Sequence, residues 1–123
     1  MSEGTYARIT REQLAKKLRD TSPDNEGRDN GFALVNVLGR EAFEREHIPG
    51  SINVPKDELS VLEQKFDTGK EVIVYCASPE CDASPRVAEA LTRRGFRRVV
   101  DYEGGLSDWK QGGYETTSAS TEA

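Results

Sequence analysis

The sequence predicts an α/β domain in which helices cover both faces of a sheet. Three apolar runs, FALVNVL, VIVY and RVVDY, are too short for helices, and segments with helical spacing separate them. Nearly continuous apolar runs are typical of strands that are buried on both faces. The alternation of such strands with helices therefore indicates a three-layer arrangement.

The first predicted helix lies within ITREQLAKKL, residues 9–18. Thr10 and Gln13 have the spacing of a capping box, and Leu14 and Leu18 follow one turn apart. The polar segment 19–31 that follows contains glycine and proline and has no periodicity, so we expect a surface loop there.

Shorter elements follow this loop along the rest of the chain. The expected strands are 32–38, 52–54, 72–75 and 98–102. The expected helices are 40–47, 56–66, 84–94 and 104–110. We assign residues 6–113 to a single domain and expect flexible termini at 1–5 and 114–123.

Composition excludes several classes of protein. The chain has 17 Lys+Arg against 22 Asp+Glu, a net charge of -5, which argues against a nucleic-acid-binding protein. We expect no membrane association, because no apolar run approaches the roughly 20 residues of a membrane span. The N-terminus lacks an apolar signal segment, so we expect a cytoplasmic protein with reduced thiols, monomeric by default.

Both cysteines of the chain, Cys76 and Cys81, lie in one short segment. With 2 Cys and 1 His, the sequence provides neither a disulfide scaffold nor a pattern for a zinc site. Cys76 directly follows the strand VIVY, where ligands usually bind in α/β sheets. Ser84 and Pro85 have the residue types of an N-cap and a first helical position, so we expect the helix to start there. The unpaired N–H groups of such a helix start favour an anion, and in that setting a thiol pKa can fall from about 8.5 to the range of about 3.5–7.5.

Two stretches carry a family resemblance. LVNVLGREAFEREHIPGSINVP and VIVYCASPECDASPRVAEALTRRGFRRVVDYEGGLSDWKQGG resemble, in order and spacing, the signatures of the rhodanese-like (thiosulfate sulfurtransferase-like) family. Together they cover roughly Ile9 to Gly113. The resemblance implies a mainly parallel five-stranded sheet flanked by helices on both faces. It also implies transfer of sulfane sulfur through a persulfide on Cys76, without a metal or organic cofactor.

The sequence departs from the family pattern at three places. The expected loop from Cys76 to Ala83 has eight residues, where sulfurtransferases of the family usually have six. Ala83 stands where the family commonly has a loop arginine. Asn36 and Leu38 replace the usual Asp and Arg of the first signature, which we interpret as an adjustment of the fold.

Cys81 allows two further interpretations. The segment CDASPR imitates a six-residue loop ending at Arg86 and would make Cys81 the nucleophile, but the strand-end position favours Cys76. Cys81 is also a candidate resolving thiol that closes a disulfide with Cys76, provided that the two Cα atoms approach within about 7 Å.

The predicted function is sulfur transfer from a small sulfur-containing anion such as thiosulfate to a thiol or protein acceptor, with Cys76 as the catalytic residue. Two alternatives remain open. One is a thiol redox or arsenate/phosphate-handling enzyme that uses both cysteines, and the other is a non-catalytic binding module. The residues expected to bind substrate are Ala77, Ser78, Pro79, Glu80, Cys81, Asp82, Ala83, Ser84 and Arg86.

Overall fold

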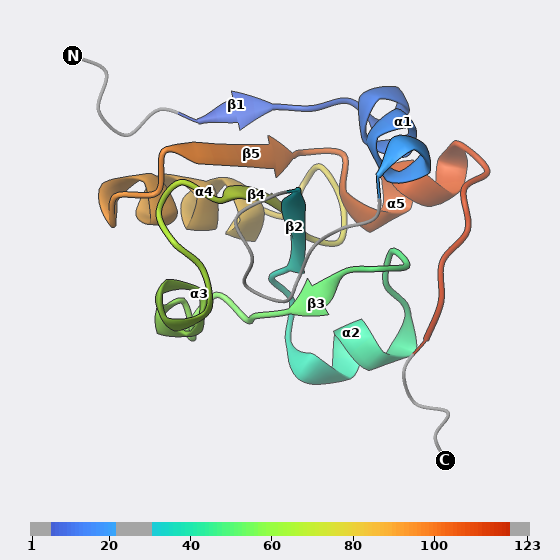
Figure 1. Ribbon diagram of the computed structural model, residues 1–123. Helices are drawn as coiled ribbons and strands as arrows, with labels where there is room; N and C mark the ends of the chain where they lie inside the picture. The colour runs from blue at the N-terminus through green and yellow to red at the C-terminus, as the bar shows by residue number, and fades with distance from the viewer. Residues whose placement is uncertain (1–5, 22–30, 119–123) are drawn as a thin grey trace.

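The computed structural model describes residues 6–21 and 31–118 and contains one five-stranded sheet (Figure 1). Its strands are β1 (Ala7–Arg8), β2 (Phe32–Asn36), β3 (Ile52–Asn53), β4 (Glu71–Tyr75) and β5 (Arg98–Tyr102). Its helices are α1 (Arg11–Asp20), α2 (Arg40–Arg45), α3 (Ser60–Lys65), α4 (Ala83–Arg93) and α5 (Gly105–Gln111). Most of the predicted loop 19–31, together with residues 1–5 and 119–123, lies outside the described residues.

All strand pairs of this sheet are parallel, in the order β1-β5-β4-β2-β3. The α/β fold class predicted from the alternating elements is therefore confirmed. β4 lies at the centre of the sheet and pairs with β2 and β5 over its whole length. Because the strands are parallel, their carboxyl ends meet at one edge, and the residue after β4 lies in the middle of that edge.

Side chains of the strands alternate between two buried faces. One face, here called the α4 face, packs against α3 and α4, and the other, the α1 face, packs against α1 and α5. The strand residues of the α4 face are Ala33, Val35, Val72, Val74 and Val99. Those of the α1 face are Phe32, Leu34, Ile73, Tyr75, Val100 and Tyr102. This double burial explains why the strands read as apolar runs without polar alternation.

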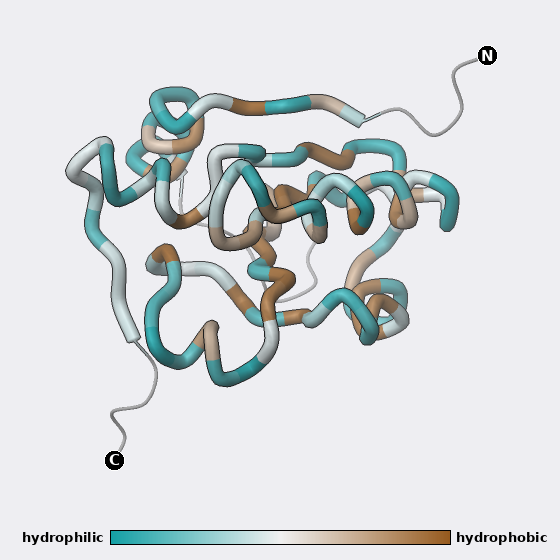
Figure 2. The backbone as a smooth tube through the Cα atoms, turned by 180° about the vertical axis from the view of Figure 1, so that it is seen from behind, coloured by the Kyte–Doolittle hydropathy of each residue, from teal (hydrophilic) through white to brown (hydrophobic). Residues whose placement is uncertain are grey.

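The distribution of hydropathy along the backbone follows these layers. Figure 2 shows hydrophobic segments in the centre of the molecule and hydrophilic stretches along the surrounding helices. Within residues 6–21 and 31–118, no helix is both long enough and apolar enough to cross a membrane.

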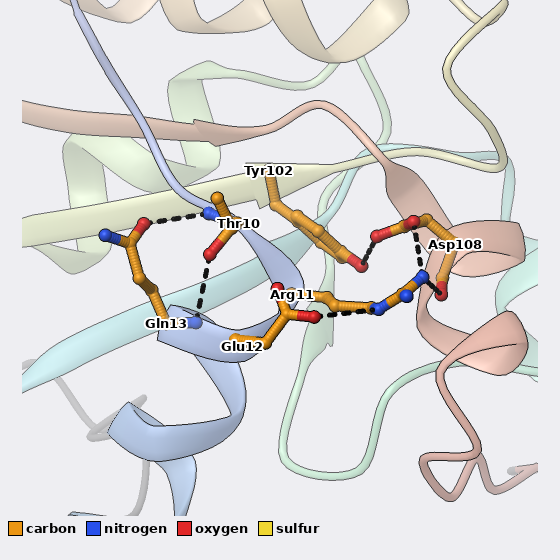
Figure 3. Close-up of polar contacts among 6 residues, drawn as sticks. All are labelled: Thr10, Arg11, Glu12, Gln13, Tyr102 and Asp108. Carbon is orange, nitrogen blue, oxygen red and sulfur yellow. Dashed lines mark hydrogen bonds and ion pairs between the residues drawn. The ribbon is translucent and has the colours of Figure 1, made fainter.

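The capping box predicted for the first helix is confirmed. The Thr10 hydroxyl accepts from Gln13 N–H at 3.1 Å, and the Gln13 side chain accepts from Thr10 N–H at 3.0 Å. These contacts satisfy donors that a helix start leaves unpaired. Figure 3 shows both bonds at the start of α1.

Part of the segment expected to be a flexible terminus makes defined contacts. Tyr114 stacks on Trp109 with ring centroids 4.5 Å apart, and Thr117 forms an antiparallel bridge with His47. The Thr116 hydroxyl donates to a Glu46 carboxylate oxygen at 2.8 Å. Residues 114–117 therefore pack against α5 and the end of α2.

Candidate active site

Cys76 follows the last residue of β4, as the sequence predicted. Its side chain belongs to the buried cluster of the α4 face, and 1% of the residue is exposed. The loop after it leads into α4 and is drawn in yellow in Figure 1. A cysteine at this edge of a parallel sheet lies where α/β proteins usually bind their ligands.

The start of α4 differs from the prediction. The helix begins at Ala83 with Asp82 as its N-cap, so the loop runs from Cys76 to Asp82 and is one residue shorter than expected. Ser84 is not the N-cap, because it lies in the first turn with only 1% of its surface exposed. Ala83, a residue type with high helix propensity, packs against the buried cluster of the α4 face. The helix therefore begins at Ala83, one residue before the predicted start.

Cys81 lies inside this loop, and the structure joins it to Cys76 in a disulfide, with the two Cα atoms 6.5 Å apart. The Cys81 N–H donates to the Ser78 carbonyl at 3.0 Å, which folds the loop back toward β4. The CDASPR interpretation is wrong as a loop assignment, because residues 83–86 are helical.

The residues expected to bind substrate differ in their accessibility. Cys81, Ser78 and Ala83 are half-buried, and Ser84 is buried. The exposed members are Ala77, Pro79, Glu80, Asp82 and Arg86. Arg86 lies in the first turn of α4, and its Nε donates to an Asp82 carboxylate oxygen at 3.0 Å. This ion pair holds the guanidinium at the rim of the loop.

The first turn of α5 supports the loop from the other side. Leu106 N–H donates to the Cys76 carbonyl at 2.9 Å, and Ser107 N–H donates to the Ala77 carbonyl at 2.8 Å. Gly105 has a φ of +71°, and a Cβ built on it would lie 2.7 Å from the Cys76 oxygen and from the Ser78 nitrogen. Only glycine allows this close approach of the two backbones without strain.

Asp108 ties α5 to α1 and to β5, as Figure 3 shows. Its carboxylate accepts from the Arg11 guanidinium at 2.8 Å and from the Tyr102 hydroxyl at 2.6 Å. Burial, followed by the hydrogen bond to Asp108, raises the pKa of Tyr102, so this phenol stays protonated as a donor. These contacts set the position of α5 and, through it, the start of the cysteine loop.

Tyr75, the residue before Cys76, is buried and its hydroxyl lies at the centre of a hydrogen-bond network. The Tyr75 hydroxyl accepts from Ile48 N–H at 3.0 Å and from the Asn36 side-chain amide at 3.1 Å. It also contacts the Ser51 hydroxyl at 2.8 Å, and Ser51 itself donates to the Ile48 carbonyl. Tyr75 therefore donates to Ser51 and links the turn of residues 47–51 to the end of β4. Asn36, which stands where the family pattern usually has Asp, therefore has a structural role in this network.

His47 and Trp109 have structural contacts away from the cysteines. The His47 ring stacks on Phe43 and donates from Nδ1 to the Phe43 carbonyl at 2.6 Å. Trp109 donates from its indole nitrogen to the Glu115 carbonyl at 2.8 Å and packs edge-on against Tyr102. Trp109 belongs to the buried cluster of the α1 face, whereas Cys76 belongs to that of the α4 face. In the described part of the chain, no group of three or more His, Cys, Asp or Glu side chains could hold a metal ion.

Asp101 is a residue that the sequence analysis missed. It pairs in register with Val74 and is fully buried on the α4 face, so it lies on the same face as Cys76. Within residues 6–21 and 31–118, neither of its carboxylate oxygens has a partner at hydrogen-bonding geometry. Burial raises the pKa of Asp101 to about 6; the Ser84 hydroxyl, which lies close to the carboxylate, lowers it, Glu103 raises it and Arg8 lowers it. The run RVVDY places Asp101 in a strand, but Arg98 of the same strand is exposed, so the run alone does not show which charged residue is buried.

The fold and the site together define a parallel α/β protein with a cysteine loop at the carboxyl end of its central strand. The sequence model of the Rhodanese-like domain matches residues 10–112, and the chain belongs to this family. The resemblance noted in the sequence is thereby confirmed.

Individual relatives support the same assignment. The chain is 31% identical to the thiosulfate sulfurtransferase GlpE of Coxiella burnetii over 79 residues, which are 64% of this chain and 72% of that protein. It is 26% identical to the Bacillus subtilis protein YrkF over 81 residues, 66% of this chain but only 43% of the relative. The solved structure of the BH2092 protein of Bacillus halodurans has a TM-score of 0.80 at 23% identity, covering 92% of this chain and 77% of that one. At this level of identity, the likeness to the BH2092 protein shows the fold alone.

Proposed function

We propose that this protein is a sulfurtransferase that carries sulfane sulfur as a persulfide on Cys76. The observation that carries the proposal is the position of Cys76, at the end of the central strand and in the loop before an 11-residue helix. The resemblance to GlpE, a thiosulfate sulfurtransferase by name, points to the same chemistry. A nucleophilic thiolate next to a helix start needs no basic side chain to be anionic at neutral pH.

The first half-reaction forms the persulfide. The Cys76 thiolate attacks the outer sulfur of thiosulfate, a new S–S bond forms, and the S–S bond of thiosulfate breaks to release sulfite. Backbone N–H groups of the loop and of the first turn of α4 stabilise the persulfide anion. In the second half-reaction a thiophilic acceptor, such as cyanide or a thiolate, takes the outer sulfur and restores the Cys76 thiolate. This is covalent, ping-pong chemistry.

Mass spectrometry of the reduced protein tests the proposal. After thiosulfate treatment and removal of excess reagent, the Cys81→Ser variant is expected to gain one sulfur atom and to release one equivalent of sulfite. The Cys76→Ser variant is expected to gain none, because a hydroxyl cannot form a persulfide. A Cys81→Ser protein that stays unmodified would contradict the proposal and favour a non-catalytic binding module.

Arg86 is the exposed cation closest in sequence to the loop, and we expect it to attract the thiosulfate anion. Arg86→Gln should raise the KM for thiosulfate roughly two- to fivefold, the size of one exposed charge contact of about 0.5–1 kcal/mol. Arg93→Gln is the matched control, because Arg93 forms the equivalent ion pair with Glu89, at 2.8 Å, near the far end of the same helix. Equal KM values for Arg86→Gln and the wild type would remove Arg86 from the binding site.

A further inference from the structure

The cysteine loop holds a second thiol within bonding distance of the first. The structure joins Cys76 and Cys81, whose Cα atoms lie 6.5 Å apart, within the range that a disulfide allows. Both residues contact the same apolar cluster under α4, Cys76 buried and Cys81 half-buried. Sulfur transfer to an external acceptor requires only Cys76, so the simple reaction leaves Cys81 without a use.

Backbone hydrogen bonds hold the loop on both sides of the paired cysteines. The Ser78–Cys81 hydrogen bond closes a turn, and the bonds from α5 to the Cys76 and Ala77 carbonyls fix the first half of the loop. Cys81 is the last residue of that turn and lies two residues before Ala83, where α4 begins. The two sulfur atoms therefore meet inside a framework that is held by backbone contacts on both sides.

We propose that Cys81 discharges the persulfide of Cys76 as hydrosulfide, which makes the protein a thiosulfate reductase that consumes dithiol reducing equivalents. This inference rests on the proposed sulfurtransferase function, because it starts from the persulfide that the first half-reaction forms. It differs in the fate of the sulfur, since the product is free sulfide and the acceptor is a residue of the same loop.

The discharge step balances within the chain. The Cys81 thiolate attacks the Cys76 Sγ, which is the inner sulfur of the persulfide. The Cys76–Cys81 bond forms, the bond between the inner and outer sulfur atoms breaks, and the outer sulfur leaves as hydrosulfide with the proton that Cys81 lost. The outer sulfur is reduced, and the two cysteines are oxidised to the disulfide.

Proximity favours this route over external acceptors. An intramolecular thiol experiences an effective concentration far above that of free thiols in solution. Once the disulfide has formed, neither sulfur can attack thiosulfate, so the protein must be reduced before each new turnover. A dithiol reductant opens the Cys76–Cys81 bond by thiol–disulfide exchange and restores both thiols. Sulfide release is therefore coupled to the supply of that reductant.

A single-turnover experiment separates this reaction from simple transfer. The full chain is reduced, freed of reductant under anaerobic conditions and treated with thiosulfate, and sulfite, sulfide and intact mass are then measured. The wild type is expected to release close to one sulfite and one sulfide per chain and to lose two hydrogens by mass. Cys81→Ser and Cys81→Ala are expected to release sulfite only and to retain one added sulfur. With dithiothreitol as the dithiol reductant, the wild type should release sulfide at least about tenfold faster than either variant.

The outcomes distinguish the two proposals. A wild type that keeps the added sulfur and releases no sulfide would overturn the role of Cys81 while leaving sulfur loading intact. Absence of sulfite and of added sulfur in all three proteins would instead overturn the sulfurtransferase function itself. Reduced wild type without thiosulfate must keep its mass, and Cys76→Ser must release neither product. Sulfide release from Cys76→Ser would contradict the direction of attack.

Discussion

Gly105→Ala is expected to slow sulfur loading of Cys76 by about 10- to 100-fold and to lower the free energy of unfolding by roughly 3 kcal/mol. The left-handed backbone at φ +71° contributes about 1 kcal/mol of this loss. The rest arises because the new Cβ would lie 2.7 Å from the Cys76 oxygen, a backbone atom that cannot rotate away. α5 must then move from the loop and lose its two hydrogen bonds to Cys76 and Ala77, worth about 1 kcal/mol each.

Gly113→Ala is the matched control for this substitution. Gly113 has a similar φ of +84°, but no atom of the described residues lies within 4 Å of a Cβ placed there. The Gly113→Ala variant should therefore lose only the backbone contribution of about 1 kcal/mol to the free energy of unfolding, and it should keep wild-type sulfur loading. Urea unfolding and the rate of sulfite release measure both effects. Equal losses in the two variants would show that close packing of α5 on the loop is not what makes Gly105 necessary.

Asp101→Asn is expected to remove a pH-dependent loss of stability. The folded-state pKa of Asp101 is raised to about 6, so between about pH 4 and pH 6 the folded protein binds a proton more tightly than the unfolded chain. Stability from this group is therefore present at low pH and declines as pH rises through that window. A shift of about two pKa units corresponds to roughly 3 kcal/mol at neutral pH.

Urea unfolding of wild type and Asp101→Asn between about pH 4 and pH 8 measures this difference. The free energy of unfolding of the wild type should fall relative to that of the variant as pH rises to about 6, and the difference should then stay constant. Asp82→Asn, which removes an exposed carboxylate at the start of α4, is the control for the loss of one negative charge. Parallel curves for wild type and Asp101→Asn would mean that water or a partner solvates the Asp101 carboxylate.

Local signals predicted most of the fold. β2, β4 and β5 were found because double burial requires continuous apolar runs, and α1 because its capping box is a short-range pattern. α3 begins at Ser60 rather than at residue 56, because the Pro55 carbonyl accepts from Glu58 N–H in a turn before the helix. Helix boundaries thus depended on contacts that the residue pattern does not contain.

The features that the sequence did not predict depend on contacts between residues far apart in the chain. β1 has two exposed residues and no apolar run, and its strand conformation depends on pairing with β5. Ser84 has the residue type of an N-cap, but it is buried in the first turn of α4 and does not cap the helix. At the site, the position of Cys76 followed from the strand pattern, whereas the approach of Gly105 and the burial of Asp101 required the tertiary structure.

The pairing of β1 with β5 also has a consequence for how the chain folds during synthesis. Ala7 is in register with Val100, so β1 pairs with the strand of this sheet that is synthesised last. Such non-local pairing is slow, and β1 lacks its sheet partner until β5 has emerged. During that interval β4, which precedes Cys76, lacks its neighbour β5 and is an open edge of the growing sheet. A chain truncated before Arg98 keeps that edge permanently, and we expect it to aggregate by edge-to-edge pairing.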